Sequence, residues 1–314
     1  MSRPIRPGRD PTIASMAGAT RDGQPLSYNR APAADLAPWV GRIYVTKVAA
    51  PNDHVLQCGL LNDTALLRVQ LRGEWVADTA SGRITKGNSA LFFGPQSRRM
   101  PITVTGPFIS AGLAFNPGAC HALRGPKIGE WLDRLTPLDT FGGDSARWLS
   151  RFDPDASPEE WCLAIEDGVR QMVEQAGGGE PDPVSRRFEA VAHVDPTISV
   201  ARFADDCGIE QRRLERIVRR DFGLPPKQVL RRARALDMAS HLRGVADQDE
   251  AEELALRYYD QSHLIRDFAH YFGMSPRQFV EMPQPLMTLS LETRQARRLE
   301  MIERLAPGEV RPWE

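Results

Sequence analysis

The sequences FADDCGIEQRRLERIVRRDFG (Phe203–Gly223) and LALRYYDQSHLIRDFAHYFG (Leu254–Gly273) share one design. Each predicts a short helix, a turn, and a second helix that opens with polar residues and closes on an Arg-rich or Arg-x-Phe stretch. Leu214 and Leu264 fall at equivalent places. Two helix-turn-helix units in tandem predict a DNA-binding protein, because a helix of this length fits the major groove, with its first turns at base edges and its basic flank at phosphate.

The residues around each unit carry a family resemblance. The motifs are Gly223-Leu224-Pro225-Pro226-Lys227 with Arg234, then Tyr259-Asp260-Gln261-Ser262-His263-Leu264-Ile265-Arg266-Asp267-Phe268 and Gly273-Met274-Ser275-Pro276. They resemble the C-terminal domain of AraC/XylS-family transcription regulators over residues 185–283. One such motif would be weak evidence for the family, but two motifs at the family's separation are specific evidence. The resemblance implies a regulator that binds double-stranded DNA, acting as an activator rather than a repressor. The acidic stretch Asp247–Glu253 is expected to meet RNA polymerase or the sensor domain, or else to be an ordinary solvated surface.

In the first unit we expect a leading helix with Phe203–Asp206, a turn at Gly208, and a second helix, called here the reading helix, over Glu210–Arg220. With Glu210 near the N-cap, Leu214 and Ile217 or Val218 point inward. The exposed face then holds the candidate base contacts Arg212, Glu215 and Arg216. A guanidinium can bond guanine O6 and N7 together, and a carboxylate can accept from cytosine N4.

Other basic residues are expected to meet phosphates, which position a protein without specifying sequence. These candidates are Arg219, Arg220, Lys227, Arg231 and Arg232. The alternative for each is an ordinary solvated side chain.

In the second unit Asp260 is the expected N-cap. Gln261, Ser262 and Arg266 are expected to face outward, and the core is expected to take Leu264, Ile265 and Phe268. Gln261 suits adenine and Arg266 suits guanine or a phosphate. His263 either contacts DNA or packs and caps the helix.

The leading helix of the second unit departs from the family pattern of an alanine followed four residues later by a turn glycine. Glu253 and Arg257 fall at those positions, unless the turn is two residues shorter and Ala255 is the matching alanine. We therefore expect the first unit to contribute more to DNA binding. Pro226–Leu242 is expected to form one helix that spaces the reading helices about one DNA turn, roughly 34 Å, apart.

The N-terminal half has a different pattern. Short β-rich runs at 41–48, 65–71 and 102–104 are separated by turn signals at 51–53, 72–73 and 86–88, which predicts an antiparallel barrel or sandwich. Gly94-Pro95 and the stretch from Gly112 to Ala119 resemble the cupin-like sensory domain of a branch of the same family, which implies a small-molecule effector. The expected fold class is α+β, a cupin-like barrel followed by an all-α DNA-binding domain.

Helices are expected on both sides of the DNA-binding region. Ser157-Pro158-Glu159-Glu160 is a capping box that starts a helix to about Gln175, whose apolar face packs on the barrel or forms a dimer seam. Ser290–Leu305 predicts a charged helix that lies on the surface, docks on the DNA module or binds a partner. The expected divisions are a flexible tail (1–35), a sensory domain (36–150), a helix and linker (151–183), the DNA-binding domain (184–283) and an extension (284–314).

Composition limits the expected binding partners and the expected cellular compartment. The 314 residues carry a formal net charge of −1, with a basic stretch at 210–234 beside an acidic one at 237–253, which suits a local phosphate contact rather than general polyanion binding. The four cysteines, Cys58, Cys120, Cys162 and Cys207, include no C-x-x-C pair and predict reduced thiols in the cytoplasm. No signal peptide or 18-residue apolar segment is evident, so we expect neither export nor a membrane partner.

Three alternative functions make different demands on the sequence. A cupin-type metalloenzyme needs a cluster of histidines, but the β-rich region offers His54 and the nearby His121 without a His-x-His pair, so no metal or cofactor is expected. A DNA-repair alkyl acceptor needs an activated cysteine, for which Cys120 beside His121 is the only hint. A third alternative is a regulator without a ligand, whose barrel serves assembly alone.

Overall fold

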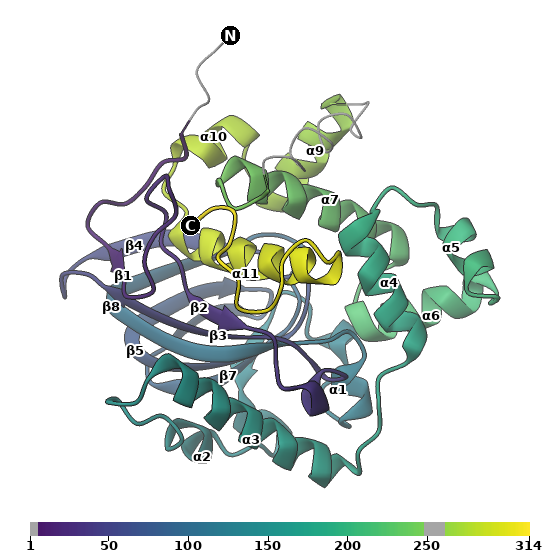
Figure 1. The fold of residues 1–314 in the computed structure, drawn as a ribbon, viewed down its shortest axis with the longest axis horizontal. Helices are drawn as coiled ribbons and strands as arrows, with labels where there is room; N and C mark the ends of the chain where they lie inside the picture. Colours follow the sequence, from purple (N-terminus) through teal and green to yellow (C-terminus); the bar gives the residue numbers. More distant parts are fainter. Residues whose placement is uncertain (1–5, 248–260) are drawn as a thin grey trace.

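The computed structural model describes residues 6–247 and 261–314. A β-rich half comes first and a helical half follows, as expected for the α+β class (Figure 1). The strands are β1 (Ala14–Ser15), β2 (Tyr28–Arg30), β3 (Val40–Ala49), β4 (Val55–Leu60), β5 (Leu66–Thr79), β6 (Gly82–Lys86), β7 (Ser89–Phe93), β8 (Met100–Phe115) and β9 (Leu135–Pro137).

The β-rich half contains short helices, and the helical half consists mostly of longer ones. The former are η1 (Ala34–Leu36), α1 (Ala119–Ala122), η2 (Ile128–Glu130), η3 (Leu138–Phe141) and α2 (Ser145–Leu149). The latter are α3 (Pro158–Ala176), α4 (Pro183–Val194), α5 (Val200–Asp206), α6 (Gln211–Phe222), α7 (Pro226–Leu242), α9 (Gln261–Phe272), α10 (Pro276–Glu281) and α11 (Pro285–Met301).

The described strands form one nine-stranded antiparallel sheet. Its main path runs β1-β3-β8-β5-β7-β9, and the long strand β8 pairs with β3, β4 and β5. The β-rich runs predicted from sequence overlap β3, β5 and β8, with the second run starting one residue before β5, so the N-terminal β-rich domain is confirmed.

The predicted turn at Arg72–Gly73 is wrong, because β5 continues through it. The register with β8 shifts between Gln70 and Glu74, so the pair forms a bulge. Gly73 has φ +92°, and a Cβ there would lie 2.9 Å from Phe108 Cβ. Glycine is required at this position by both the backbone conformation and the close approach of β8, which accounts for the turn-like signal inside a strand.

Strand alternation gives the sheet two different faces. One face, called here the α3 face, presents Ile43, Val45, Leu67 and Val69 to a core that includes Trp161 and Ile165 of α3. The opposite face, the α11 face, carries Arg42, Tyr44, Arg68 and Gln70. In Figure 1 α11 lies between this face and α7, and α3 lies on the other side of the sheet.

Helix α3 begins at the capping box predicted from sequence. The Ser157 hydroxyl accepts from the Glu160 amide, Pro158 occupies the first turn, and Gly177 ends the helix at φ +84°. Its apolar side packs on the sheet, which was one of the two alternatives for that face.

Residues 14–30 correct the prediction of a flexible tail. β1 and β2 both pair with β3, and Leu26 is buried in the core. The prediction rests on the Pro, Gly, Ser and Arg content of this segment, but backbone pairing with the edge of a sheet needs few apolar side chains.

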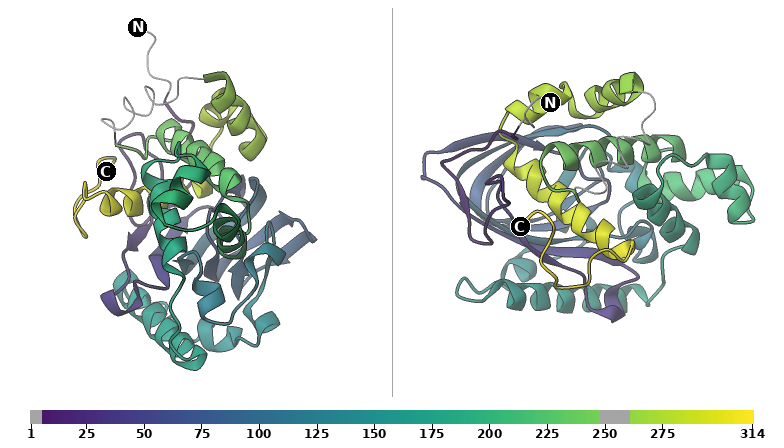
Figure 2. Two further views of the ribbon diagram at one scale, coloured as in Figure 1. Left: turned by 90° about the vertical axis from the view of Figure 1, so that its right-hand side faces the viewer. Right: turned by 45° about the horizontal axis from the view of Figure 1, so that its top comes forward.

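The C-terminal segment forms a helix, α11, that starts five residues before the predicted Ser290. It does not lie on the surface. Leu286, Met287, Leu291 and Leu299 are buried in the core shared with the sheet, α7 and α9. The right-hand view of Figure 2 shows α11 lying across the sheet beside α7.

Candidate nucleic-acid interface and interior cavity

The first helix-turn-helix unit has the predicted geometry. Helix α5 leads to a turn in which Gly208 adopts φ +64°, and α6 follows from the N-cap Glu210, whose side chain makes no capping bond. Leu214, Ile217 and Val218 are buried. Phe188 of α4 packs edge-on against Phe203 and Phe222, which fixes the pair of helices on α4.

The outer side of α6 carries the predicted base contacts. Arg212, Arg216 and Arg219 are exposed, and none of them forms an ion pair with another residue in the described part of the chain. Glu215 is half-buried and accepts from Gln211 Nε2 at 3.2 Å. Three arginines on one exposed helix side give a strongly cationic edge.

Two of the predicted phosphate contacts, Arg220 and Arg231, pair with acidic residues of the protein. Arg220 donates to Asp221 Oδ1 at 2.6 Å and lies 3.6 Å from Asp182. Arg231 pairs with Asp267 of α9, so it joins α7 to α9. Lys227 at the start of α7 is exposed and remains a candidate.

Arg232 was predicted wrongly as a phosphate contact. It is completely buried, and its guanidinium donates to the carbonyl oxygens of Gln96 at 2.6 Å and Asp63 at 2.8 Å. The prediction rests on its positive charge, but an arginine side chain has five N–H donors and can also bind buried carbonyl oxygens. Arg232 thereby ties α7 to two loops of the β-rich half.

The second unit is described only in part. Gln261 and Ser262 belong to α9, but their side chains lie outside the described residues, as do Glu253, Ala255, Arg257 and Asp260. His263 and Arg266 are exposed, and Phe268 is buried against Phe272 and Phe279. Ile265, predicted to be in the core, is 46% exposed because it falls on the outward side of α9.

The two units are joined by α7, which has the predicted bounds of Pro226 and Leu242. The acidic stretch predicted after it is described only as far as Asp247, which lies 3.5 Å from Arg304.

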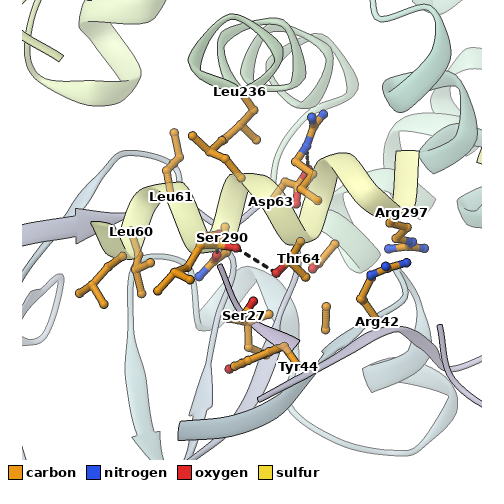
Figure 3. A pocket seen from close by; sticks show the side chains of 18 of the residues that line it. Ser27, Arg42, Tyr44, Leu60, Leu61, Asp63, Thr64, Leu236, Ser290 and Arg297 are labelled. Atoms are coloured by element: carbon orange, nitrogen blue, oxygen red, sulfur yellow. Dashed lines mark hydrogen bonds and ion pairs between the residues drawn. The ribbon is translucent and has the colours of Figure 1, made fainter. Parts of the chain in front are cut away.

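A cavity of about 90 Å³ lies between the α11 face of the sheet and α11 itself (Figure 3). Ser27 and Tyr44 point into it from the sheet side, Ser290 and Arg297 from α11, and Leu236 from α7. No sequence motif singled out these residues, because they come from four separate segments of the chain.

The cavity wall contains buried polar atoms without partners. Arg68 is buried, donates to Ser110 Oγ at 3.1 Å and lies over the Trp75 ring at 4.2 Å, while its Nε has no acceptor. Asn62 Nδ2, also on the cavity wall, likewise lacks an acceptor among the described residues. Burial lowers the pKa of Arg68 and raises that of Tyr44. Such unsatisfied groups are costly, and a polar ligand or water can satisfy them.

The cysteine proposed as an alkyl acceptor is not activated. Cys120 is buried, and burial, together with nearby Asp221, raises its pKa to about 12. A reactive thiolate needs the opposite shift. His54 contacts Asp10 at 2.9 Å, and within residues 6–247 and 261–314 no three His, Cys, Asp or Glu side chains gather as a metal site. None of the helices in these ranges has the length and apolar character needed to span a bilayer.

Comparisons with known proteins match both halves of the chain. Residues 203–282 match a family described as a helix-turn-helix domain, and residues 28–137 match a domain of unknown function (DUF6597). A comparison with curated proteins finds no match.

Several solved structures have a similar arrangement. ToxT from Vibrio cholerae is 8% identical, with 76% of this chain and 97% of ToxT covered and a TM-score of 0.46. Fatty-acid-bound ToxT from strain SCE256 is 10% identical, with 84% and 98% covered and a TM-score of 0.44. The AraC-like transcriptional activator CuxR is 14% identical, with 67% and 86% covered and a TM-score of 0.30.

The tandem helices and the family match agree on the same residues. This chain therefore carries, over residues 203–282, an AraC-type helix-turn-helix domain, the DNA-binding module of a transcription regulator, and a β-rich domain precedes it.

Proposed function

We propose that the protein recognises a specific DNA sequence mainly through α6, with Arg212 and Arg216 at base edges. The exposed side of α6 carries this proposal, because its arginines lack ion-pair partners in the described chain while its opposite side is sealed by Leu214 and Val218. A guanidinium without a protein partner is available for guanine.

The remaining candidates take supporting roles. Glu215 accepts from cytosine or orients Gln211, and Arg219 and Lys227 meet phosphates. Gln261, Ser262, His263 and Arg266 of α9 contact the next major groove, with α7 as the spacer. Arg220 meets phosphate only by sharing its contact with Asp221.

We further propose that the β-rich domain, predicted as residues 36–150 and here enlarged by β1 and β2, senses a small molecule in the cavity under α11. The unsatisfied polar atoms of Arg68 and Asn62, which both line this cavity, support a polar ligand. Because α11 packs on both the sheet and α7, a ligand that shifts α11 alters how α6 and α9 are presented. In this proposal the protein activates transcription in the cytoplasm through contact with RNA polymerase, as a monomer or a homodimer.

One observation favours a regulator without a ligand. The cavity under α11 measures only about 90 Å³, since α11 fills most of the space over the sheet. Thermal unfolding against a metabolite library separates the two candidates: stabilisation by several degrees with one compound supports sensing, and no stabilisation by any compound supports assembly alone.

Selection of genomic DNA fragments by the purified full chain tests the DNA-binding proposal. We expect one motif with two half-elements about 10 base pairs apart. Arg216→Ala should abolish the selection, whereas Arg83→Ala, an exposed arginine on β6, should leave it intact. Weak binding of all fragments with a steep salt dependence would contradict specific recognition by α6.

A further inference from the structure

A second and larger cavity, of about 390 Å³, lies on the α3 face of the sheet. Its floor is apolar and comes from the strands and the segment after β8, with Leu67, Phe92 and Phe115. Its walls come from η3, α2 and α3, where Leu138, Trp148 and Met172 contribute. Ligand pockets measure roughly 300–1,000 Å³. This cavity therefore has room for a metabolite-sized molecule, and it is larger than the cavity under α11.

Three arginines line this cavity: Arg124, Arg147 and Arg151. None of them forms an ion pair with a carboxylate in the described part of the chain. Asp144, the one acid among the described lining residues, is occupied as the N-cap of α2, where it accepts from the Arg147 amide at 2.8 Å. The wall of the cavity is therefore cationic.

Arg151 is held in place but left incompletely bonded. Its Nη2 donates to Gln171 Oε1 of α3 at 2.5 Å, and its guanidinium lies 5.4 Å from the centre of the Trp148 ring. Its Nε is buried without any acceptor in the described chain. A buried donor of this kind strongly favours an anionic acceptor, because charge-assisted hydrogen bonds are about twice as strong as neutral ones.

Two backbone features constrain the cavity wall. Arg124 has φ +54°, a left-handed conformation that costs a non-glycine residue free energy and marks a constrained position. Gly168 of α3 lets the Trp148 indole pack directly on the helix, since a Cβ there would lie 2.6 Å from Trp148 Cη2. Close packing of this wall keeps Trp148 and Arg151 in fixed positions.

We infer that this cavity binds an organic carboxylate with an apolar body. The carboxylate lies between the guanidinium groups of Arg151 and Arg147, and the apolar part lies over Leu67, Phe92 and Met172. The cavity wall at Leu123–Pro126 leads directly to η2, which packs on the end of α6: a Cβ at Gly223 would lie 3.2 Å from Ile128 Cγ2. The segment that forms this wall thereby connects the cavity, through η2, to the end of α6.

Titration calorimetry with the purified full chain tests this inference without depending on DNA binding. The probes are decanoate and naphthalene-2-carboxylate, each compared with its neutral alcohol, decanol or naphthalene-2-methanol. We expect both carboxylates to bind and both alcohols to bind at least tenfold more weakly. Failure of both carboxylates to bind at millimolar concentration would overturn the inference, as would equal affinity for the alcohols.

Variants locate the site. Arg151→Gln and Arg147→Gln should each weaken carboxylate binding roughly tenfold to a hundredfold, the range for loss of a charged hydrogen bond. Met172→Trp should block binding by filling the cavity, and Arg83→Gln on β6 should leave it unchanged. Thermal unfolding of each variant checks that the fold is retained. Carboxylate binding that survives both arginine substitutions and Met172→Trp would show that the probe binds elsewhere and would overturn the proposed site.

Discussion

Arg294 of α11 donates to Asp237 of α7 at 2.6 Å and to Asp63, in the loop after β4, at 2.9 Å. One nearly buried guanidinium thus connects the C-terminal helix, the helix between the two DNA-binding units and the β-rich domain. Burial alone would raise the pKa of Asp63, but Arg294, His193 and Arg232 together outweigh burial, and the pKa of Asp63 lies below its usual value.

Substitution of Arg294 should destabilise the whole chain. Arg294→Met leaves Asp237 and Asp63 without their shared cation, and removing one partner of a buried ion pair costs about 3–5 kcal/mol. The measurement is the free energy of unfolding in urea. Arg277→Met, which removes an exposed pair with Glu281 on α10, is the matched control and should change little. Equal stability of both variants would contradict the bridging role.

Stability should fall as the solution becomes mildly acidic. His193 on α4 is buried, and burial, aided by Arg294, holds its pKa well below 6.5. The unfolded chain then binds more protons than the folded chain below pH 6.5. This contribution is complete above pH 6.5 and is lost as the pH falls toward the pKa of the folded state, by at most about 1.4 kcal/mol per pH unit.

His193→Asn should flatten the pH dependence between pH 6.5 and 5. The exposed His121→Asn is the control and should leave the slope as it is. Urea unfolding at several pH values gives both slopes, and an unchanged slope in His193→Asn would assign the effect to other groups.

The two reading helices should contribute unequally to DNA binding. Arg216→Ala removes an expected base contact and should cost about 1–3 kcal/mol of binding free energy. Arg266→Ala should cost less, since the leading helix of its unit departs from the family pattern. Fluorescence anisotropy at one fixed salt concentration compares them, and similar losses would contradict the dominance of α6.

Lys227 should behave as a phosphate contact. Lys227→Ala is expected to weaken binding of specific and unrelated DNA alike and to reduce the slope of log K against log salt by about 1. A salt titration of the variant measures this slope. A loss confined to one DNA sequence would instead indicate a base contact.

Alanine substitutions at two glycines should distinguish the cost of backbone strain from the cost of a steric clash. Gly73 and Gly82 have φ +92° and +108°, but only a Cβ at Gly73 meets a neighbour within 4 Å. Gly82→Ala should therefore cost about 1–2 kcal/mol from conformation alone, and Gly73→Ala should cost more. Thermal unfolding compares them, and equal costs would mean that β8 moves away from the bulge without penalty.

The correct sequence predictions all rest on local signals. The capping box of α3, the bounds of α7 and the turn at Gly208 depend on residues within a few positions of one another. The same holds for the inward positions Leu214 and Val218, which follow from helical spacing. The sequence by itself therefore determined the tandem units and the order of the two halves of the chain.

Tertiary structure decided what the local signals leave open. Arg232 has the sequence environment of a phosphate contact, yet it bonds two carbonyls of the sheet loops more than 130 residues earlier. Helix α11 has a charged sequence because its arginines meet buried acids on α4 and α7, such as Glu189 and Asp237. Both cavities likewise combine residues from distant segments. Helix caps and turns are set by bonds between near neighbours, whereas the partner of a buried charge is set by which surfaces meet when the chain folds.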